Sequence, residues 1–218
     1  MRNVNVGVYE FSELSKDVQE DVIERYRARL ADLLDEDLED IMNRELNRYT
    51  DNLDFELRYS LNCCQGDGVS FDGIVEGKEE LLTLASLVYD NKIPNNISRL
   101  INWEIIYIVE FVRGNSNYVH KYTVTPTISD NYNMGKDYCH ISKAMAEFDE
   151  AINEWYLNIC DDLEKFGYDT IESLYSFDNI KCYIDENSLE FYEDGGLEME
   201  TPDELTLTGF IGAPFSAK

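Results

Sequence analysis

Few side chains in this chain could act as nucleophiles, bases or metal ligands. There are two histidines, His120 and His140, and five cysteines among 218 residues. Cys64 and His140 could form a nucleophile and its base, because catalytic partners are often remote in sequence. His120 lies in a predicted hairpin, where a surface role is more common than catalysis. The odd cysteine count, without framework spacing, indicates reduced thiols.

No motif in the sequence predicts a metal or cofactor site. Cys139-His140 resembles half of a zinc site, but no second pair follows at zinc spacing. Cys63-Cys64 lacks the two-residue spacer of redox and zinc motifs. Residues 66–68, Gly-Asp-Gly, are too few and too acidic to cradle phosphate and favour a tight turn. Residues 185–196 lack the ligand register of a calcium loop. We therefore expect no catalytic residue, no metal and no cofactor.

Net charge is the most informative property of the chain. It holds 45 acidic residues against 18 basic ones, a formal net charge of −27. Such a protein repels nucleic acid and anionic membranes and is attracted to basic surfaces. The 44% hydrophobic content allows a full core, so the charge does not indicate disorder. Halophilic adaptation is an alternative source of acidity, which the many Asn and Ile residues do not favour.

The acids are concentrated in two helical segments. Residues 147–204 hold 19 acids with only Lys165 and Lys181 as bases, and residues 32–40 form a second cluster. Acids at three- and four-residue steps on a helix place charges about 5 Å apart, a spacing comparable with the phosphates of a nucleic acid strand. An ordinary solvated face is the alternative. The candidate contact residues are Glu147, Glu150, Glu154, Asp161, Asp162 and Glu164, with Asp35, Glu36, Asp37, Glu39 and Asp40 as a second patch.

Long amphipathic helices must carry these acids. Apolar residues recur at three- and four-residue steps from Val18 to Met42, without Gly or Pro, which predicts one helix or two joined near Asp35; we favour two. A second helix is predicted over residues 141–166, with Gly167 as its end. Shorter helices are predicted at 79–89, from 95 or 96 onward, and at 170–175. Alternation predicts strands at residues 4–11, 55–61, 69–75, 104–112, 118–125, 180–184 and 188–192.

Helices and antiparallel hairpins in mixed order indicate an α+β fold, an antiparallel sheet packed with long acidic helices. The length suits a single compact domain over residues 1–218, with a subdivision near 130–140 as an option. No secretory signal or apolar span is evident, so a cytoplasmic location is expected. The tail after Thr201 is expected to be partly ordered.

Three segments resemble a group of small acidic bacteriophage proteins. Residues 6–15 end in F-x-E-L-S before an amphipathic helix, and residues 59–71 read Y-S-x4-Q-G-D-G-x-S-F. Residues 189–195 are similar to the acidic segment near the C-terminus of that group. Some members carry a loose label as antitoxin-like. The resemblance implies a phage origin and expression in a bacterial cytoplasm.

These observations favour a non-enzymatic, phage-encoded inhibitor. Its acidic surface would occupy the nucleic-acid channel of a host defence nuclease, such as a restriction enzyme or a CRISPR effector. The expected partner is a basic nucleic-acid-binding host protein, with no direct contact to nucleic acid or membrane. An antitoxin-like or regulatory module that binds by protein contacts alone is the first alternative. A thiol enzyme using Cys64 and His140 is the second.

Overall fold

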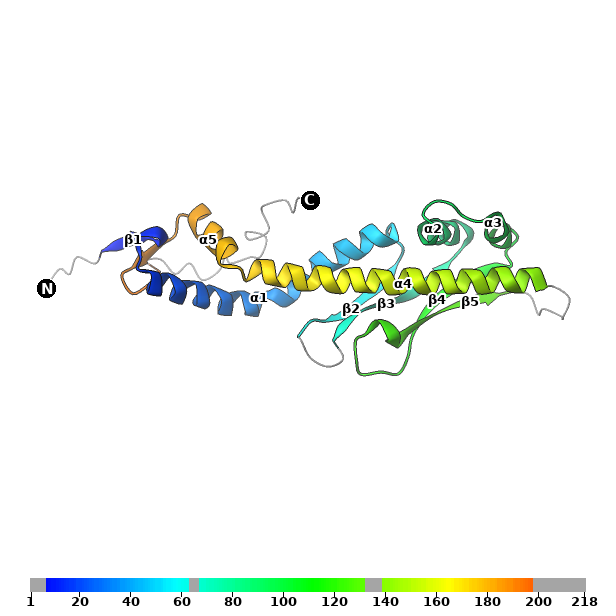
Figure 1. Ribbon diagram of the computed structural model, residues 1–218, viewed down its shortest axis with the longest axis horizontal. Coiled ribbons are helices and arrows are strands. Elements are labelled where there is room, and N and C mark those ends of the chain that lie inside the picture. The colour runs from blue at the N-terminus through cyan, green and yellow to red at the C-terminus, as the bar shows by residue number, and fades with distance from the viewer. Residues whose placement is uncertain (1–6, 63–66, 132–138, 198–218) are drawn as a thin grey trace. The chain divides into compact units, whose positions relative to one another are not determined.

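The computed structural model describes residues 7–62, 67–131 and 139–197 (Figure 1). The chain divides into two compact units. The terminal unit comprises residues 1–40 and 169–218, and the central unit comprises residues 41–168. Neither boundary falls in the 130–140 region that the sequence suggested. Helices and antiparallel sheets make up the structure, so the predicted α+β class is confirmed.

The central unit is built on a four-stranded antiparallel sheet in the order β2-β3-β4-β5. The period of two sends Phe71 and Phe111 to one face, and Phe55 on the edge strand joins them with ring centroids 5.0 Å from each. The four strands span Phe55–Ser60 (β2), Gly68–Glu76 (β3), Ile106–Arg113 (β4) and Val124–Asp130 (β5).

Helices cover the aromatic face of this sheet. In the core of the unit, Tyr156 of α4 lies over Phe71 at a centroid distance of 4.7 Å, and Trp155 meets the same ring at 6.1 Å. Figure 1 shows α2 and α3 beside α4, and Tyr89, just after α2, stacks on Phe148. The helices are α2 (Lys78–Val88), α3 (Asn95–Asn102), α4 (Cys139–Leu174) and α1 (Lys16–Thr50), the last contributing its C-terminal turns.

Two helix predictions are wrong in the same direction. Residues 16–50 form one helix, because no breaker interrupts the acidic run at Asp35. Gly167 does not end α4, which continues to Leu174. A Cβ at position 167 would lie 2.5 Å from Cδ1 of Leu61 and 3.2 Å from the sulfur of Met42. The glycine therefore permits close packing in mid-helix.

The predicted hairpin partner is also displaced along the chain. We expected a strand at residues 118–125, but β5 begins at Val124 and includes Pro126, which an edge strand tolerates. Residues 114–123 form a longer connection that contains a 3₁₀ turn, η2 (Lys121–Thr123). His120 precedes that turn, and its Nδ1 accepts a hydrogen bond from the backbone N–H of Tyr122.

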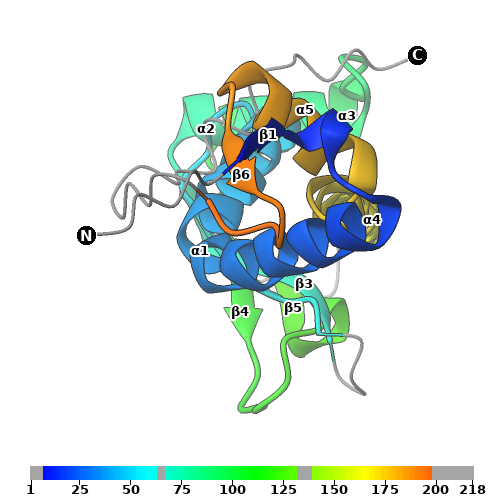
Figure 2. The same ribbon diagram turned by 90° about the vertical axis from the view of Figure 1, so that its left-hand side faces the viewer.

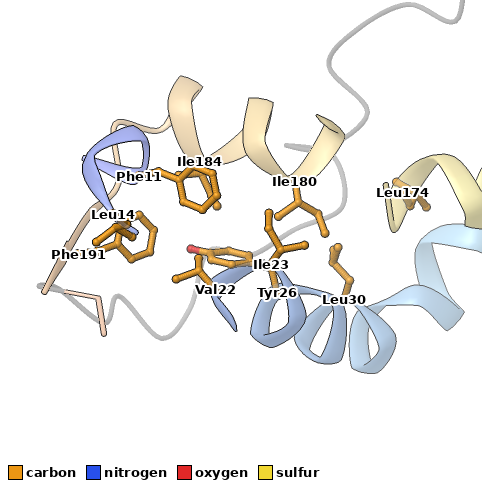
Figure 3. Packing of buried hydrophobic residues seen from close by; sticks show 10 residues of the cluster. All are labelled: Phe11, Leu14, Val22, Ile23, Tyr26, Leu30, Leu174, Ile180, Ile184 and Phe191. Atoms are coloured by element: carbon orange, nitrogen blue, oxygen red, sulfur yellow. The ribbon is translucent and has the colours of Figure 1, made fainter. Parts of the chain in front are cut away.

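The terminal unit packs α1 and α5 (Phe177–Glu186) with a two-stranded sheet of β1 (Val8–Glu10) and β6 (Glu190–Tyr192). A 3₁₀ turn, η1 (Phe11–Glu13), follows β1. Figure 2 faces this unit, and α5 and the small sheet lie on one side of α1. The buried cluster of the unit is drawn in Figure 3: Phe11, Leu14, Val22, Ile23, Tyr26, Leu30, Leu174, Ile180, Ile184 and Phe191.

The predicted strand at residues 180–184 is wrong, because this segment is the core of α5. Ser176 caps the helix by accepting a hydrogen bond from the backbone N–H of Asn179. Ile180 and Ile184 lie one turn apart and are both buried. At the N-terminus, β1 covers only part of the predicted strand at 4–11, and residues 4–6 lie outside the described chain.

Candidate protein-binding surface

Four of the six predicted acids of α4 lie on the side of the helix that faces away from the sheet. At about 100° per residue, Glu147, Glu150, Glu154 and Asp161 fall within about 60° of one another. All four are exposed. The apolar stripe that carries Tyr156 lies opposite and anchors the helix to the sheet. The sequence therefore placed four of the six proposed α4 acids in one row.

The remaining two predicted acids of α4 flank this row. Asp162 is exposed and lies near Tyr49 of α1; burial first, and the charge of Asp162 next, raise the pKa of Tyr49. Glu164 is half-buried and packs toward Gly68, where a Cβ would lie 3.4 Å from its Oε2. These two carboxylates face neighbouring elements and are less available to a partner.

Lysines neutralise part of the row, which sequence reasoning did not foresee. Nζ of Lys143 lies 3.5 Å from a carboxylate oxygen of Glu147. Lys121, from the β4–β5 connection, forms an ion pair with Asp161. In the described part of the chain, Glu150 and Glu154 have no basic partner. Among the six predicted acids of α4, these two glutamates form an exposed, uncompensated pair one helical turn apart.

The second predicted patch belongs to the terminal unit. Glu39 and Asp40 on α1 are exposed. The side chains of Asp35, Glu36 and Asp37 lie outside the described part of the chain, although their backbone is helical. The terminal unit contains 24 acidic and seven basic residues, a net of −17, and the central unit contains 21 and eleven, a net of −10. Charge density is therefore higher in the terminal unit.

An apolar surface is the feature that sequence reasoning missed. Ile74 and Val112 project from the sheet face opposite α4 and are 56% and 52% exposed. Tyr107 on β4 is also exposed. Glu76 and Glu110 stand on the same strands as these apolar side chains. The signal was present in the sequence, since residues 111–129 contain no acid in a chain with 45.

The candidate pair of Cys64 and His140 is described only in part. Cys64 lies outside them, and His140 is exposed in the first turn of α4. Burial raises the pKa of Cys160 to about 12, so this thiol is not a nucleophile at neutral pH. A hydrogen bond to Glu186 raises the pKa of Cys182. Across residues 7–62, 67–131 and 139–197, no group of three His, Cys, Asp or Glu side chains is arranged to hold a metal.

The Gly-Asp-Gly segment has contacts typical of a structural turn. Oδ1 of Asp67 accepts a hydrogen bond from the hydroxyl of Ser60 at 2.6 Å, and Oδ2 accepts one from the backbone N–H of Asn62 at 2.8 Å. Gly66 lies outside the described residues. Both carboxylate oxygens of Asp67 therefore accept hydrogen bonds that stabilise the end of β2 against the start of β3.

No protein-family model, curated protein or solved structure matches this chain. No helix in the described segments combines the length and the apolar character that crossing a membrane requires.

Proposed function

We propose that this chain is a non-enzymatic inhibitor that binds a basic, nucleic-acid-binding protein through the acidic row of α4. In this proposal the chain is phage-encoded and acts in the cytoplasm of the bacterial host. Its target is a defence nuclease, such as a restriction enzyme or a CRISPR effector, whose nucleic-acid channel it occupies. The acids of α1, including Glu39 and Asp40, form the second contact patch.

The uncompensated pair of Glu150 and Glu154 is the observation that supports this proposal most. The two carboxylates stand one turn apart on a helix that a full aromatic core holds in place. Like charges at this spacing destabilise a helix, so a role in binding explains the pair better than a role in stability. A rigid row of negative charge is also the arrangement that competes with a phosphate backbone for a basic channel.

A salt-resolved pull-down tests this proposal. The full chain is immobilised, exposed to bacterial lysate, and eluted with a salt gradient before mass spectrometry. We expect a nuclease or other DNA-binding protein that salt releases and added duplex DNA displaces. A charge-reversed variant, Glu150→Lys with Glu154→Lys, should lose this partner.

The matched control carries the same change in net charge at another site. Glu20→Lys with Glu193→Lys reverses two exposed acids of the terminal unit that lie outside both patches. It should retain the partner. Equal loss in the two variants would show that overall charge, and not the α4 row, attracts the partner.

The exposed apolar residues of the sheet favour a second candidate function. Ile74 and Val112, with acids on the same strands, would suit an antitoxin-like module that binds its partner by protein contacts without imitating DNA. In that case neither the salt gradient nor added duplex DNA should elute the captured partner. Val112→Asp should release it, whereas the reversal of Glu150 and Glu154 should not.

A further inference from the structure

The terminal unit contains a cavity of about 420 Å³ that the acidic surface does not explain. Its apolar floor consists of Val22 and Tyr26 from α1 and Phe191 from β6, all buried. Its rim carries the guanidinium groups of Arg25 and Arg29, one helical turn apart. The volume and the apolar lining with a few polar groups are those of a small-molecule site.

A tight turn after β6 forms one wall of the cavity. The N–H of Gly195 donates to the carbonyl of Tyr192 at 2.8 Å, and the N–H of Tyr192 donates to the carbonyl of Gly196 at 2.7 Å. Gly195 has φ +80°, and a Cβ there would lie 2.9 Å from Cγ2 of Val22. The turn is thus pressed against α1 in a conformation that only glycine adopts without strain.

Arg25 is held at the cavity by this turn. Its Nη1 donates to the carbonyl of Gly195 at 3.2 Å, and its Nη2 donates to the carbonyl of Asp194 at 3.3 Å. The guanidinium is planar and has five donors, so it retains donors after these two bonds. The arginine is therefore fixed in place but not saturated.

The arginines of α1 differ in their partners. Arg27 forms an ion pair with Glu24 at 2.5 Å and donates to the carbonyl of Tyr175 at 2.8 Å. In the described residues no carboxylate lies within ion-pair distance of Arg25 or Arg29. Two guanidinium groups that have no carboxylate partner among the described residues, both at one cavity mouth, favour an anionic ligand.

Tyr26 supplies an aromatic wall and a hydroxyl. Burial, more than any neighbouring charge, raises the pKa of Tyr26 to about 12, so its hydroxyl stays protonated at neutral pH. Figure 3 shows its ring within the buried cluster, with the hydroxyl directed toward Val22. The aromatic rings of Tyr26 and Phe191 in the floor of the cavity favour an aromatic ligand.

We propose that this cavity binds a small aromatic monocarboxylate. The ring lies on the floor formed by Val22, Tyr26 and Phe191, and the carboxylate pairs with Arg25 and Arg29. A singly charged ligand is favoured over a phosphate ester, because the net charge of −17 on this unit repels multiply charged anions. This proposal is independent of the target of the α4 row.

Titration with matched probes tests the proposal on the full chain. Indole-3-acetate is the carboxylate probe, indole-3-acetamide its neutral counterpart and tryptamine its cationic one. Binding is followed by NMR shifts of backbone amides and by calorimetry. We expect the acid to bind at least about ten-fold more tightly than the amide, because only the acid can form charge-assisted bonds with Arg25 and Arg29. Shifts are expected at Val22 and at residues 195–197, and tryptamine should not bind.

Two arginine variants separate binding from folding. Arg29 is exposed, so Arg29→Gln should keep the melting temperature and weaken binding of the acid about ten-fold. Arg27→Gln, on the same helix but outside the cavity, should leave affinity within about two-fold. Equal binding of acid and amide, absence of binding to the full chain, or equal weakening by the two variants would each overturn the proposal.

Discussion

Neutralising Glu150 should stabilise the protein, because this residue is repelled from both sides along α4. Glu147 lies three residues before it and Glu154 four residues after it, and all three are exposed. Each like-charge pair at these spacings costs about 0.2–0.5 kcal/mol. Glu150→Gln removes two such pairs at once, and glutamine has nearly the helix propensity of glutamate. We expect the free energy of unfolding to rise by about 0.4–1 kcal/mol.

The neighbouring glutamates provide matched controls of the same chemistry. Glu154→Gln removes one repulsive pair and should stabilise by about 0.2–0.5 kcal/mol. Glu147→Gln removes one repulsion but also the attraction to Lys143 at 3.5 Å, so its effect should be near zero. The expected order of stability is therefore Glu150→Gln, then Glu154→Gln, then Glu147→Gln.

Urea unfolding at low and high ionic strength measures these effects. The differences should be largest at about 20 mM salt and nearly vanish at about 1 M, where the screening length falls to about 3 Å. A loss of stability in Glu150→Gln, or the same change in all three variants, would refute the assignment of Glu150 as an uncompensated charge. If the proposed function is right, the most stabilised variant also binds its partner less tightly, a common conflict between stability and function.

Three further predictions concern the cores and the thiols. The buried hydroxyl of Tyr156 faces Cys160 and the Phe71 backbone without a well-formed hydrogen bond in the described structure. Tyr156→Phe should therefore change the free energy of unfolding by less than about 1 kcal/mol. Tyr156→Ala should lower it by about 3–5 kcal/mol in the same urea assay. Gly195→Ala should destabilise the protein by about 1–3 kcal/mol, since its φ of +80° strains any side chain, whereas Gly196→Ala, without a positive φ, should cost less; thermal melting compares the two. Burial raises the pKa of Cys160 to about 12, so this thiol should not react with maleimide in the folded protein at pH 8 but should react after unfolding in urea. Exposed Cys182 should react in both states. Peptide mapping by mass spectrometry distinguishes the two sites.

The sequence predicted the elements whose periodicity has only one interpretation. The α4 stripe from Phe148 to Leu163 repeats at helical spacing over several turns and was found. The segment at 180–184 was misassigned because Ile180, Cys182 and Ile184 alternate as in a strand, while the two isoleucines are also one helical turn apart. A spacing of four residues fits both the strand period of two and the helical period of about 3.6. Periodicity alone therefore cannot distinguish a strand from a helix in so short a segment.

The candidate site was predictable only where it depends on a single helix. The row of Glu147, Glu150 and Glu154 follows from spacing along α4. The ion pair of Asp161, the fourth acid of the row, with Lys121 does not follow from spacing, because that lysine lies 40 residues away in the chain. The cavity at Arg25 also depends on a long-range contact, because Gly195, whose carbonyl accepts a hydrogen bond from Arg25, lies 170 residues further along the chain. Local periodicity carries no information about such contacts.

The location of the two tryptophans makes the units spectroscopically distinct. Trp155 is packed against Phe71 and Phe111, Trp103 is 67% exposed, and both belong to the central unit. Tryptophan emission, selectively excited near the red edge, therefore reports the unfolding of the central unit alone, whereas far-ultraviolet circular dichroism reports the helices of both. Coincident denaturation curves from the two signals would mean that the chain melts as one cooperative body. Separate curves would assign an individual stability to each half without cutting the chain.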